Sequence, residues 1–393
     1  MVADPVRLER NRRAIREAGF GGLVCALPSN VLLLTGYFPV VATSIALATS
    51  ERTLLLVPED EEDLARASCA DEVQTFQAAS LKWIKPLPDV IGPSLGRLLS
   101  HINVSSGAIG YEETDWVQPA SYAAMHLFGG AMRDLLSRLA PGASFKPAKA
   151  CLESLRLIKT PAELDRIRAA CGVAGRAFAE GIGHVRPGRT ETQIAAAFRG
   201  PLLESPQDWR ADGFAFCMSG PNGAQAYKAF QRSTGRELRD GDLVLAHCNS
   251  HVGGYWTDIT RTYTLGQPTE RTRRMYQAVF AAREAALNAV KPRARAADVD
   301  RAARDVMRSF GFADQFVHPT GHGVGFAAID HNARPRLHPV SDEILQEGMV
   351  FNVEPGIYFK GECGMRHCDM VAVTSDGHEL LTPFQDRPEL LAC

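Results

Sequence analysis

Hydrophobic and polar residues follow one another in short blocks over the first part of the chain. Four apolar runs, GGLVCAL, NVLLLTGY, TSIALATS and RTLLLVP, are each about the length of a single strand. Charged, helix-like segments such as PEDEEDLARA lie between them, and Asp4-Pro5 marks the start of a helix over residues 6–18. This alternation predicts an α/β domain over residues 1–150.

The pattern changes in the second part of the chain, where two helical segments precede a strand-rich one. The first helix begins with a capping box from Thr160 to Glu163, and the second with a box from Thr190 to Gln193. After a hairpin, two more helical segments, PTERTRRMYQAVFAAREAALNAV and AADVDRAARDVMRSFG, precede further strands. Two successive units of helix, helix and sheet predict an internally duplicated α+β domain over residues 151–393.

Composition narrows the class of protein. The chain has 393 residues, of which 45% are hydrophobic and 22% charged, as in soluble globular proteins. Its net charge of −2 gives no electrostatic reason to expect nucleic acid or an anionic membrane as a partner, and no apolar run is long enough to span a bilayer. The charged amino terminus is unlike a signal peptide, and nine cysteines without CxxC spacing are typical of reduced thiols. We therefore expect a cytoplasmic protein.

Residues 247–262, HCNSHVGGYWTDITRT, predict a β-hairpin with a glycine-rich turn. With the turn centred on Val252–Gly253, His247 lies directly opposite Asp258. Facing side chains on paired strands are close enough to share one metal ion or one proton. The hairpin is therefore a candidate functional site.

Three later segments contain further candidates. HPTGHGVG holds His318 and His322 among glycines, which let backbone approach a bound group closely. MVFNVEPGIY places Glu354 in an apolar strand, where an unpaired carboxylate is costly. GMRHCDMVAV contains Arg366 and Cys368 at the start of another apolar strand.

These blocks resemble the signature blocks of the pita-bread superfamily, which includes methionine aminopeptidase, prolidase, aminopeptidase P and the metal-free creatinase. The matching segments are GDLVL…GYWTDITRTY, HPTGHGVG, MVFNVEPGIY and GMRHCDMVAVT, and NVLLLTGY and LRLIKTPAELDRIR resemble the two-domain prolidase and creatinase branch. The resemblance implies a pseudo-twofold α+β pita-bread catalytic domain, preceded by a smaller α/β creatinase-type domain. It also implies a homodimer.

The resemblance further implies a metal site with two departures. Family members hold two divalent ions with two Asp, one His and two Glu ligands. Asp258 matches the second aspartate, His322 the histidine and Glu354 the first glutamate. His247 stands at the first aspartate and Cys368 at the second glutamate.

Two substrate-side histidines of the family are also altered. Tyr227 stands where the family has a histidine after the SGPN block. A further family histidine falls on Ile329, with His331 two residues later.

The departures bear on which cofactor the site holds. A neutral imidazole ligates one ion through one nitrogen, whereas a carboxylate can bridge two. The five donors suit one borderline-soft divalent ion, Zn or Fe, with Mn possible. A metal-free site, working by proton transfer as in creatinase, is the alternative, and Cys368 is equally well explained as a buried apolar filler.

Three functions are consistent with this site. The first is hydrolysis of a C–N bond in a small amide, amidine or proline-like substrate, or a short peptide. His318, Glu354 and His331 are then the candidate proton-transfer residues, and Tyr227 and Arg366 the candidate substrate-binding residues. Arg366 would clamp a substrate carboxylate, or merely pair with Asp369. The alternatives are an Xaa-Pro dipeptidase or aminopeptidase proper, and a non-catalytic descendant that binds a small molecule or a protein.

Overall fold

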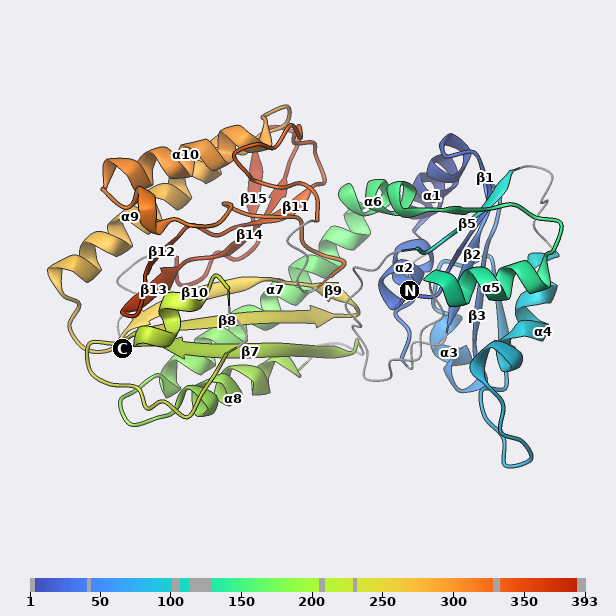
Figure 1. Ribbon diagram of the computed structural model, residues 1–393, viewed down its shortest axis with the longest axis horizontal. Coiled ribbons are helices and arrows are strands. Elements are labelled where there is room, and N and C mark those ends of the chain that lie inside the picture. Colours follow the sequence, from blue (N-terminus) through green and yellow to red (C-terminus); the bar gives the residue numbers. More distant parts are fainter. Residues whose placement is uncertain are drawn as a thin grey trace. The chain divides into compact units, whose positions relative to one another are not determined.

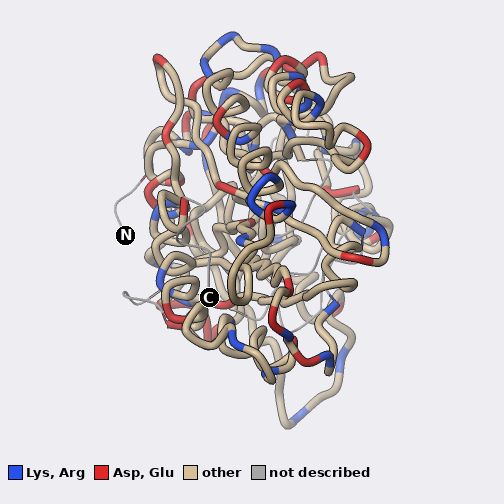
Figure 2. The backbone as a smooth tube through the Cα atoms, turned by 90° about the vertical axis from the view of Figure 1, so that its left-hand side faces the viewer, with Lys and Arg blue, Asp and Glu red and all other residues tan. Residues whose placement is uncertain are grey.

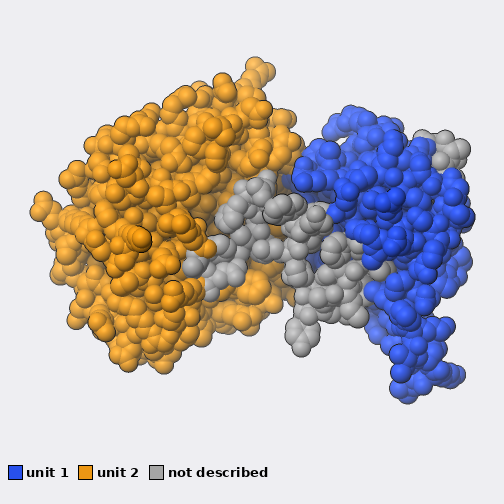
Figure 3. All heavy atoms as spheres, viewed as in Figure 1, with its two compact units in different colours: residues 1–156 blue, residues 157–393 orange. Residues whose placement is uncertain are grey.

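The computed structural model describes residues 4–40, 44–100, 107–113, 129–204, 209–228, 232–327 and 333–386. The chain divides into two compact units, residues 1–156 and 157–393, which Figure 3 colours separately. Helix α6 (Lys149–Leu157) contains both this division and the boundary expected between residues 150 and 151.

The first unit is built on one six-stranded mixed sheet with the strand order β4-β3-β2-β1-β5-β6. Strands β1, β5 and β6 run parallel, while β2 is antiparallel to both β1 and β3. The strands are β1 (Phe20–Cys25), β2 (Ile45–Ala48), β3 (Thr53–Pro58), β4 (Glu72–Phe76), β5 (Ala108–Tyr111) and β6 (Phe145–Pro147). The helices, besides α6, are α1 (Pro5–Glu17), α2 (Pro28–Thr35), α3 (Glu62–Ala65), α4 (Leu87–Leu99) and α5 (Gly129–Leu139).

One predicted strand of this unit is wrong. The run NVLLLTGY forms helix α2, which begins with Pro28 and ends at Gly36, whose φ of 73° is the left-handed conformation of a helix C-cap. A continuous apolar run has no periodicity that separates a buried strand from a buried helix, and nearly every residue of α2 is buried. The flanking proline and glycine were the signals that favoured a helix.

The second unit contains the duplicated plan that its sequence predicts. Helices α7 and α8 pack against the sheet formed by β7, β8 and β10, and helix α9 packs against the strands of the second half (Figure 1). The first half comprises α7 (Pro161–Gly181), α8 (Glu191–Leu202), β7 (Ala211–Ser219), β8 (Leu243–Val252), β9 (Tyr255–Trp256) and β10 (Ile259–Thr264). The second comprises α9 (Glu270–Ala289), α10 (Ala296–Ser309), β11 (Val350–Val353), β12 (Gly356–Phe359), β13 (Cys363–Arg366), β14 (Asp369–Val373) and β15 (His378–Leu380). Both predicted capping boxes are present, at Thr160 and Thr190.

The hairpin of the first half has a different register from the predicted one. Its two-residue turn is Gly253–Gly254, and both glycines have positive φ, which such tight hairpin turns require. His247 therefore faces Thr260 and not Asp258. A shift of two residues keeps the same side chains on the same face of the sheet, so His247 and Asp258 are diagonal neighbours.

Acidic and basic residues are mixed along the chain, without a large region of one sign on the face shown in Figure 2. Within the described residues, no helix combines the length and the apolar composition needed to cross a bilayer.

One ion-pair cluster is fully enclosed in the second unit. The carboxylate of Asp369, at the start of β14, accepts hydrogen bonds from Arg261 of β10 (2.7 Å), Arg283 of α9 and Thr382 (2.7 Å). Burial alone would raise the pKa of Asp369, but Arg261, His367 and Arg283 hold that pKa well below its usual range. The cluster ties β10, α9 and β14 together.

Replacing Arg261 by methionine is expected to lower the free energy of unfolding by about 3–5 kcal/mol, because it leaves the buried Asp369 carboxylate short of compensating charge. Urea titration followed by circular dichroism measures this loss. Arg271→Met is the control, since Arg271 pairs with Glu362 where both side chains are more than half exposed. Its loss should stay below about 1 kcal/mol. Equal losses in the two variants would contradict the assigned role of Arg261.

Candidate active site

The first half of the second unit supplies one face of the candidate site. Because side chains alternate along a strand, His247 and Asn249 of β8 share a face with Asp258 and Thr260 across the hairpin. Phe216 of β7, which pairs with His247, lies on this face as well. The hairpin thus presents its polar residues together on one side.

The second half supplies the opposing residues through glycine-rich backbone. A Cβ atom on Gly321 would lie 1.9 Å from the carbonyl oxygen of Asn352, and one on Gly323 would lie 2.0 Å from that of Arg334. Only glycine allows backbone to approach this closely. His322 therefore lies between the backbone of Asn352 and that of Arg334. Cys368 pairs through its backbone with Thr260, joining the two halves.

The structure brings the five predicted metal-site residues, and Arg366, into one buried cluster. All six residues are at most 7% exposed: His247, Asp258, His322, Glu354, Arg366 and Cys368. Their roles in binding or catalysis remain predictions.

His322 presents a lone pair to two carboxylates. Its Nδ1 lies 3.1 Å from the carbonyl oxygen of Gly323, so Nδ1 carries the hydrogen. Its Nε2 faces the amide nitrogen of Asn352 at 3.3 Å, and lies 3.6 Å from Asp258 Oδ2 and 4.0 Å from Glu354 Oε1. The Asn352 amide donates to Nε2, so a cation bound between Nε2 and the two carboxylates would have to displace this long 3.3 Å contact. Such a cation would offset the cost of burying two carboxylates side by side.

His247 stands in the opposite electrostatic setting. Its Nδ1 lies 3.1 Å from the guanidinium Nη2 of Arg366, 2.9 Å from the hydroxyl of Thr260 and 3.7 Å from Asp258 Oδ1. Because a guanidinium group only donates, Nδ1 must accept, and the hydrogen of the neutral ring lies on Nε2. The reverse tautomer, which would free Nε2 for a metal, would set an N–H against the N–H groups of Arg366.

Arg366 is fully engaged within the cluster. Besides His247, its guanidinium donates to Thr260 (Nε to Oγ1, 3.1 Å) and lies 3.6 Å from Glu354 Oε2. The predicted alternative of a pair with Asp369 is wrong, because Arg261 and Arg283 occupy that carboxylate.

Cys368 has the surroundings of a thiol. Its sulfur donates to the backbone carbonyl of Asp258 at 3.2 Å and lies 3.9 Å from Asp258 Oδ1. Burial raises the pKa of the thiol well above its ordinary value, and the carboxylates of Asp258 and Glu354 raise it further. A metal ligand would have to be the thiolate, which these neighbours disfavour.

Glu354 follows directly after β11 and combines burial with charged neighbours. Burial raises its pKa to about 7, and Asp258 adds to the rise while Arg366 and His322 oppose it. A carboxyl group that titrates near neutrality can both accept and release a proton.

The other predicted site residues lie at different places. His318 is half-buried, with Nδ1 2.8 Å from the carbonyl oxygen of Pro319 and Nε2 3.1 Å from the hydroxyl of Tyr358. The ring of Tyr227 packs against that of Tyr358, with 5.1 Å between centroids. His331 lies outside the described residues, so its catalytic assignment stays a prediction.

Two residues of the site were missed from the sequence. Thr260 contacts both His247 and Arg366, and Tyr358 contacts His318 on one side and Arg366 on the other. Thr260 follows Asp258 by two residues, the spacing that places both on one face of a strand, so period-two alternation was a usable signal. Tyr358 lies in the MVFNVEPGIY block but had no comparable signal.

The donor set fits one ion better than two. Asp258 Oδ2 and Glu354 Oε1 lie 3.6 and 4.0 Å from His322 Nε2, close to the roughly 3–4 Å that separates two ligands of one tetrahedral ion with bonds of about 2.0–2.2 Å. As the side chains stand, no three His, Cys, Asp or Glu groups in the described ranges converge on a metal position. The Nδ1 atom of His247 contacts Arg366, and the sulfur of Cys368 contacts the Asp258 carbonyl. In this arrangement neither residue is available as a ligand for a second ion.

Comparisons with known proteins agree with this architecture. Residues 165–375 match the model of metallopeptidase family M24, and residues 7–158 match the creatinase/prolidase N-terminal domain. The chain is 38% identical over 227 residues to the probable dipeptidase PepE of Mycobacterium tuberculosis, an alignment that covers 58% of each chain. It is 27% identical over 376 residues to the Xaa-Pro dipeptidase of Pyrococcus furiosus, covering 96% of this chain and 97% of that one.

A solved structure extends the similarity to three dimensions. The prolidase from Pyrococcus horikoshii matches with a TM-score of 0.76 and 25% sequence identity, covering 96% of this chain and 98% of that one. The predicted fold is confirmed by these matches. A creatinase-type domain comes first along the chain, and a pita-bread domain follows it. The chain belongs to metallopeptidase family M24.

Proposed function

We propose that the protein hydrolyses a C–N bond in a small amide, amidine or proline-like substrate, using the buried polar cluster of the second unit. The observation that carries this proposal is the contrast between the two histidines of the cluster. His322 turns a lone pair toward Asp258 and Glu354, whereas His247 turns its lone pair toward Arg366. The arrangement around His322 favours the binding of one cation. The contact of His247 with Arg366 removes a ligand that another cation would need.

The proposed cofactor is a single divalent ion held by Asp258, His322 and Glu354. A nitrogen and carboxylate oxygens suit Zn or Fe, with Mn also compatible. When bound, such an ion supplies Lewis acidity to a carbonyl group and lowers the pKa of a water molecule. The five-donor set expected from the sequence is thereby reduced to three donors.

Arg366 supplies a permanent positive charge beside the reacting groups. It holds the Glu354 carboxylate at 3.6 Å and favours the charged form of that group. A substrate carboxylate would have to displace Glu354, Thr260 or His247 to reach the guanidinium. The role of Arg366 is therefore better described as positioning Glu354 than as clamping a substrate.

His318, which contacts Tyr358, is the residue proposed to move a proton to the leaving group. Its Nδ1–H is held by the carbonyl of Pro319, which leaves Nε2 to accept from the hydroxyl of Tyr358. An imidazole with solvent access can take up a proton and pass it to a leaving nitrogen. Glu354, which is buried, would receive the proton of the attacking water through the carboxylate oxygen that does not bind the ion.

An Xaa-Pro dipeptidase proper is the second candidate, because several relatives carry that name. The altered ligands at His247 and Cys368 argue against it. A metal-free site and a non-catalytic binding protein remain outcomes of the tests below, and the homodimer and the cytoplasmic location stay predictions.

The wild-type protein should hold no more than one divalent ion per chain after saturation with Zn²⁺ or Mn²⁺ and gel filtration, as measured by plasma mass spectrometry. The double variant His247→Asp, Cys368→Glu should hold two, because it restores two carboxylate ligands. Each single variant serves as a control and should remain at one. Two ions per wild-type chain would contradict the one-ion site, and none at all would favour the metal-free alternative.

Xaa-Pro dipeptides should be hydrolysed weakly or not at all by the wild-type protein, with or without Mn²⁺. A chromatographic screen would compare these dipeptides with small amides, cyclic amides and amidines. We expect turnover of at least one of the small compounds, and its loss in Glu354→Gln. Robust Mn²⁺-dependent dipeptide turnover would instead support the dipeptidase. Absence of all turnover would support the binding protein.

A further inference from the structure

A row of aromatic rings leads along the site face of the first-half sheet toward the polar cluster. We name the rings of Trp256, Phe214, Phe216 and His247 the aromatic row. Successive centroids are 6.3, 6.5 and 6.3 Å apart, and the successive interplanar angles are only 5°, 10° and 21°. The rings are therefore nearly parallel along the whole row.

Strand pairing determines which side of the sheet the row occupies. Phe216 pairs with His247 and Phe214 pairs with Asn249, so both phenylalanines lie on the face that carries the cluster. The alternate residues of β7 are small and face α8, as the 3.0 Å from a Cβ built on Gly213 to the side chain of Leu202 shows. The large apolar residues of β7 thus point toward the site and away from the helix layer.

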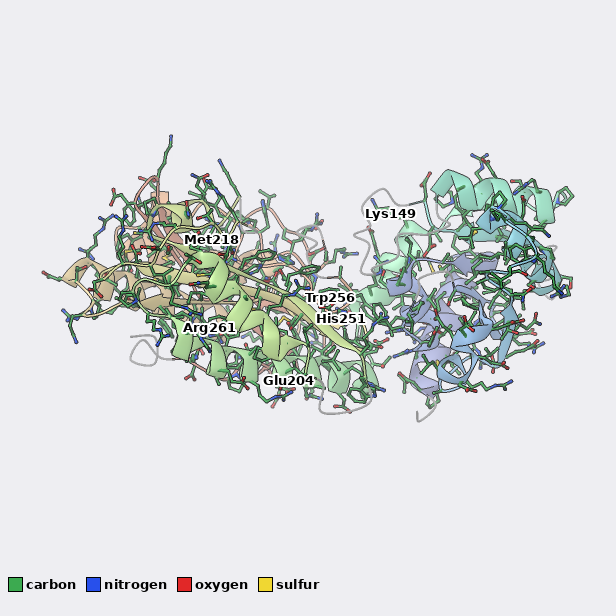
Figure 4. The ribbon with its side chains drawn as sticks, turned by 90° about the horizontal axis from the view of Figure 1, so that it is seen from below. Lys149, Glu204, Met218, His251, Trp256 and Arg261 are labelled. Carbon is green, nitrogen blue, oxygen red and sulfur yellow. The ribbon has the colours of Figure 1, made fainter. Side chains whose placement is uncertain are left out.

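The row is open at its centre. Phe214 is 47% exposed and Phe216 is half-buried, whereas His247 and Trp256 at the two ends are 3% exposed. Figure 4 labels Trp256 beside His251, whose ring packs against it with 4.5 Å between centroids and anchors that end. Two partly exposed phenylalanine rings therefore lie between two buried rings.

The rim around the cluster is aromatic elsewhere too. Phe216 and Tyr227 pack against one apolar cluster with Met218 and Tyr358. The nearest cations are already occupied, since Arg366 is engaged with Glu354 and His247, and Arg199 lies over the ring of Phe214. Among the described residues, the surface next to the cluster therefore presents partly exposed aromatic rings, and these two cations already have partners.

We propose that the substrate carries an aromatic or other large planar apolar group beside its scissile C–N bond, and that this group lies on Phe214 and Phe216. Covering these faces removes apolar surface from water, and ring-on-ring contact adds to that gain. The inference rests on the proposed function, because it takes the cluster as the reacting centre, and it extends that function by naming a substrate class.

Equilibrium binding of phenylacetamide and acetamide tests the inference without requiring turnover. The two amides differ by one phenyl ring, and isothermal titration calorimetry gives both affinities. Wild-type protein should bind phenylacetamide at least about tenfold more tightly, the ratio expected when one ring is largely buried. Phe214→Ala and Phe216→Ala should each reduce this ratio severalfold, and the double variant should bring it near one.

Phe145→Ala is the matched control, because Phe145 is a half-buried phenylalanine of β6 in the first unit. It should leave the ratio unchanged, and thermal melting should show that all variants are folded. Equal or undetectable binding of both amides by the wild-type protein would overturn the inference, as would a preference that survives in the double variant.

Hydrolysis assays separate this inference from the proposed function. Turnover of small amides without any aromatic preference would overturn the inference and leave the function standing. An aromatic preference in binding, without turnover of any amide or amidine, would leave Phe214 and Phe216 as a binding site for aromatic groups and overturn the proposed function.

Discussion

A guanidinium group keeps its charge wherever a protein places it, and Arg366 holds one in the interior of the second unit. Such a charge must be met by acceptors, and Thr260, His247 and Glu354 provide them. This demand determines the state of its neighbours. The imidazole of His247 must offer a lone pair to Arg366, so it cannot offer the same lone pair to a metal. The orientation of His247 therefore follows from one buried charge, whereas burial and the neighbouring carboxylates keep Cys368 a thiol.

The scaffold that holds Arg366 depends on a second set of buried charges on the other side of the same strands. Along β10, Thr260 points to the site and Arg261 points away from it, by the alternation of a strand. Arg261 binds the Asp369 carboxylate of β14, while the backbone of Thr260 pairs with Cys368. The two halves of the duplicated unit are thus joined where the site forms. Thr260 and Arg261 are adjacent, so a substitution that displaces Arg261 in the Asp369 cluster would also displace Thr260 in the site.

Much of this architecture was predictable from residues that act locally. The capping boxes at Thr160 and Thr190, the duplicated order of helices and sheets, and the residues of the polar cluster were all identified from short motifs. The strand predicted for NVLLLTGY was wrong because a uniformly apolar run carries no period, and the hairpin register was wrong by two because either glycine could sit in the turn. The contact of His247 with Arg366 was out of reach, since 119 residues separate them and only the fold brings them together.

The central claim is that His247 accepts a hydrogen bond from Arg366 through Nδ1 and does not ligate a metal. Nitrogen NMR of histidine-labelled protein, with His247 assigned by comparison with His247→Gln, measures this directly, because protonated and unprotonated ring nitrogens have distinct shifts. The account predicts an unprotonated Nδ1 and a protonated Nε2, unchanged when one equivalent of Zn²⁺ is added, while the Nε2 signal of His322 shifts. A hydrogen on Nδ1 of His247, or a shift of its ring nitrogens on addition of the metal, would contradict it.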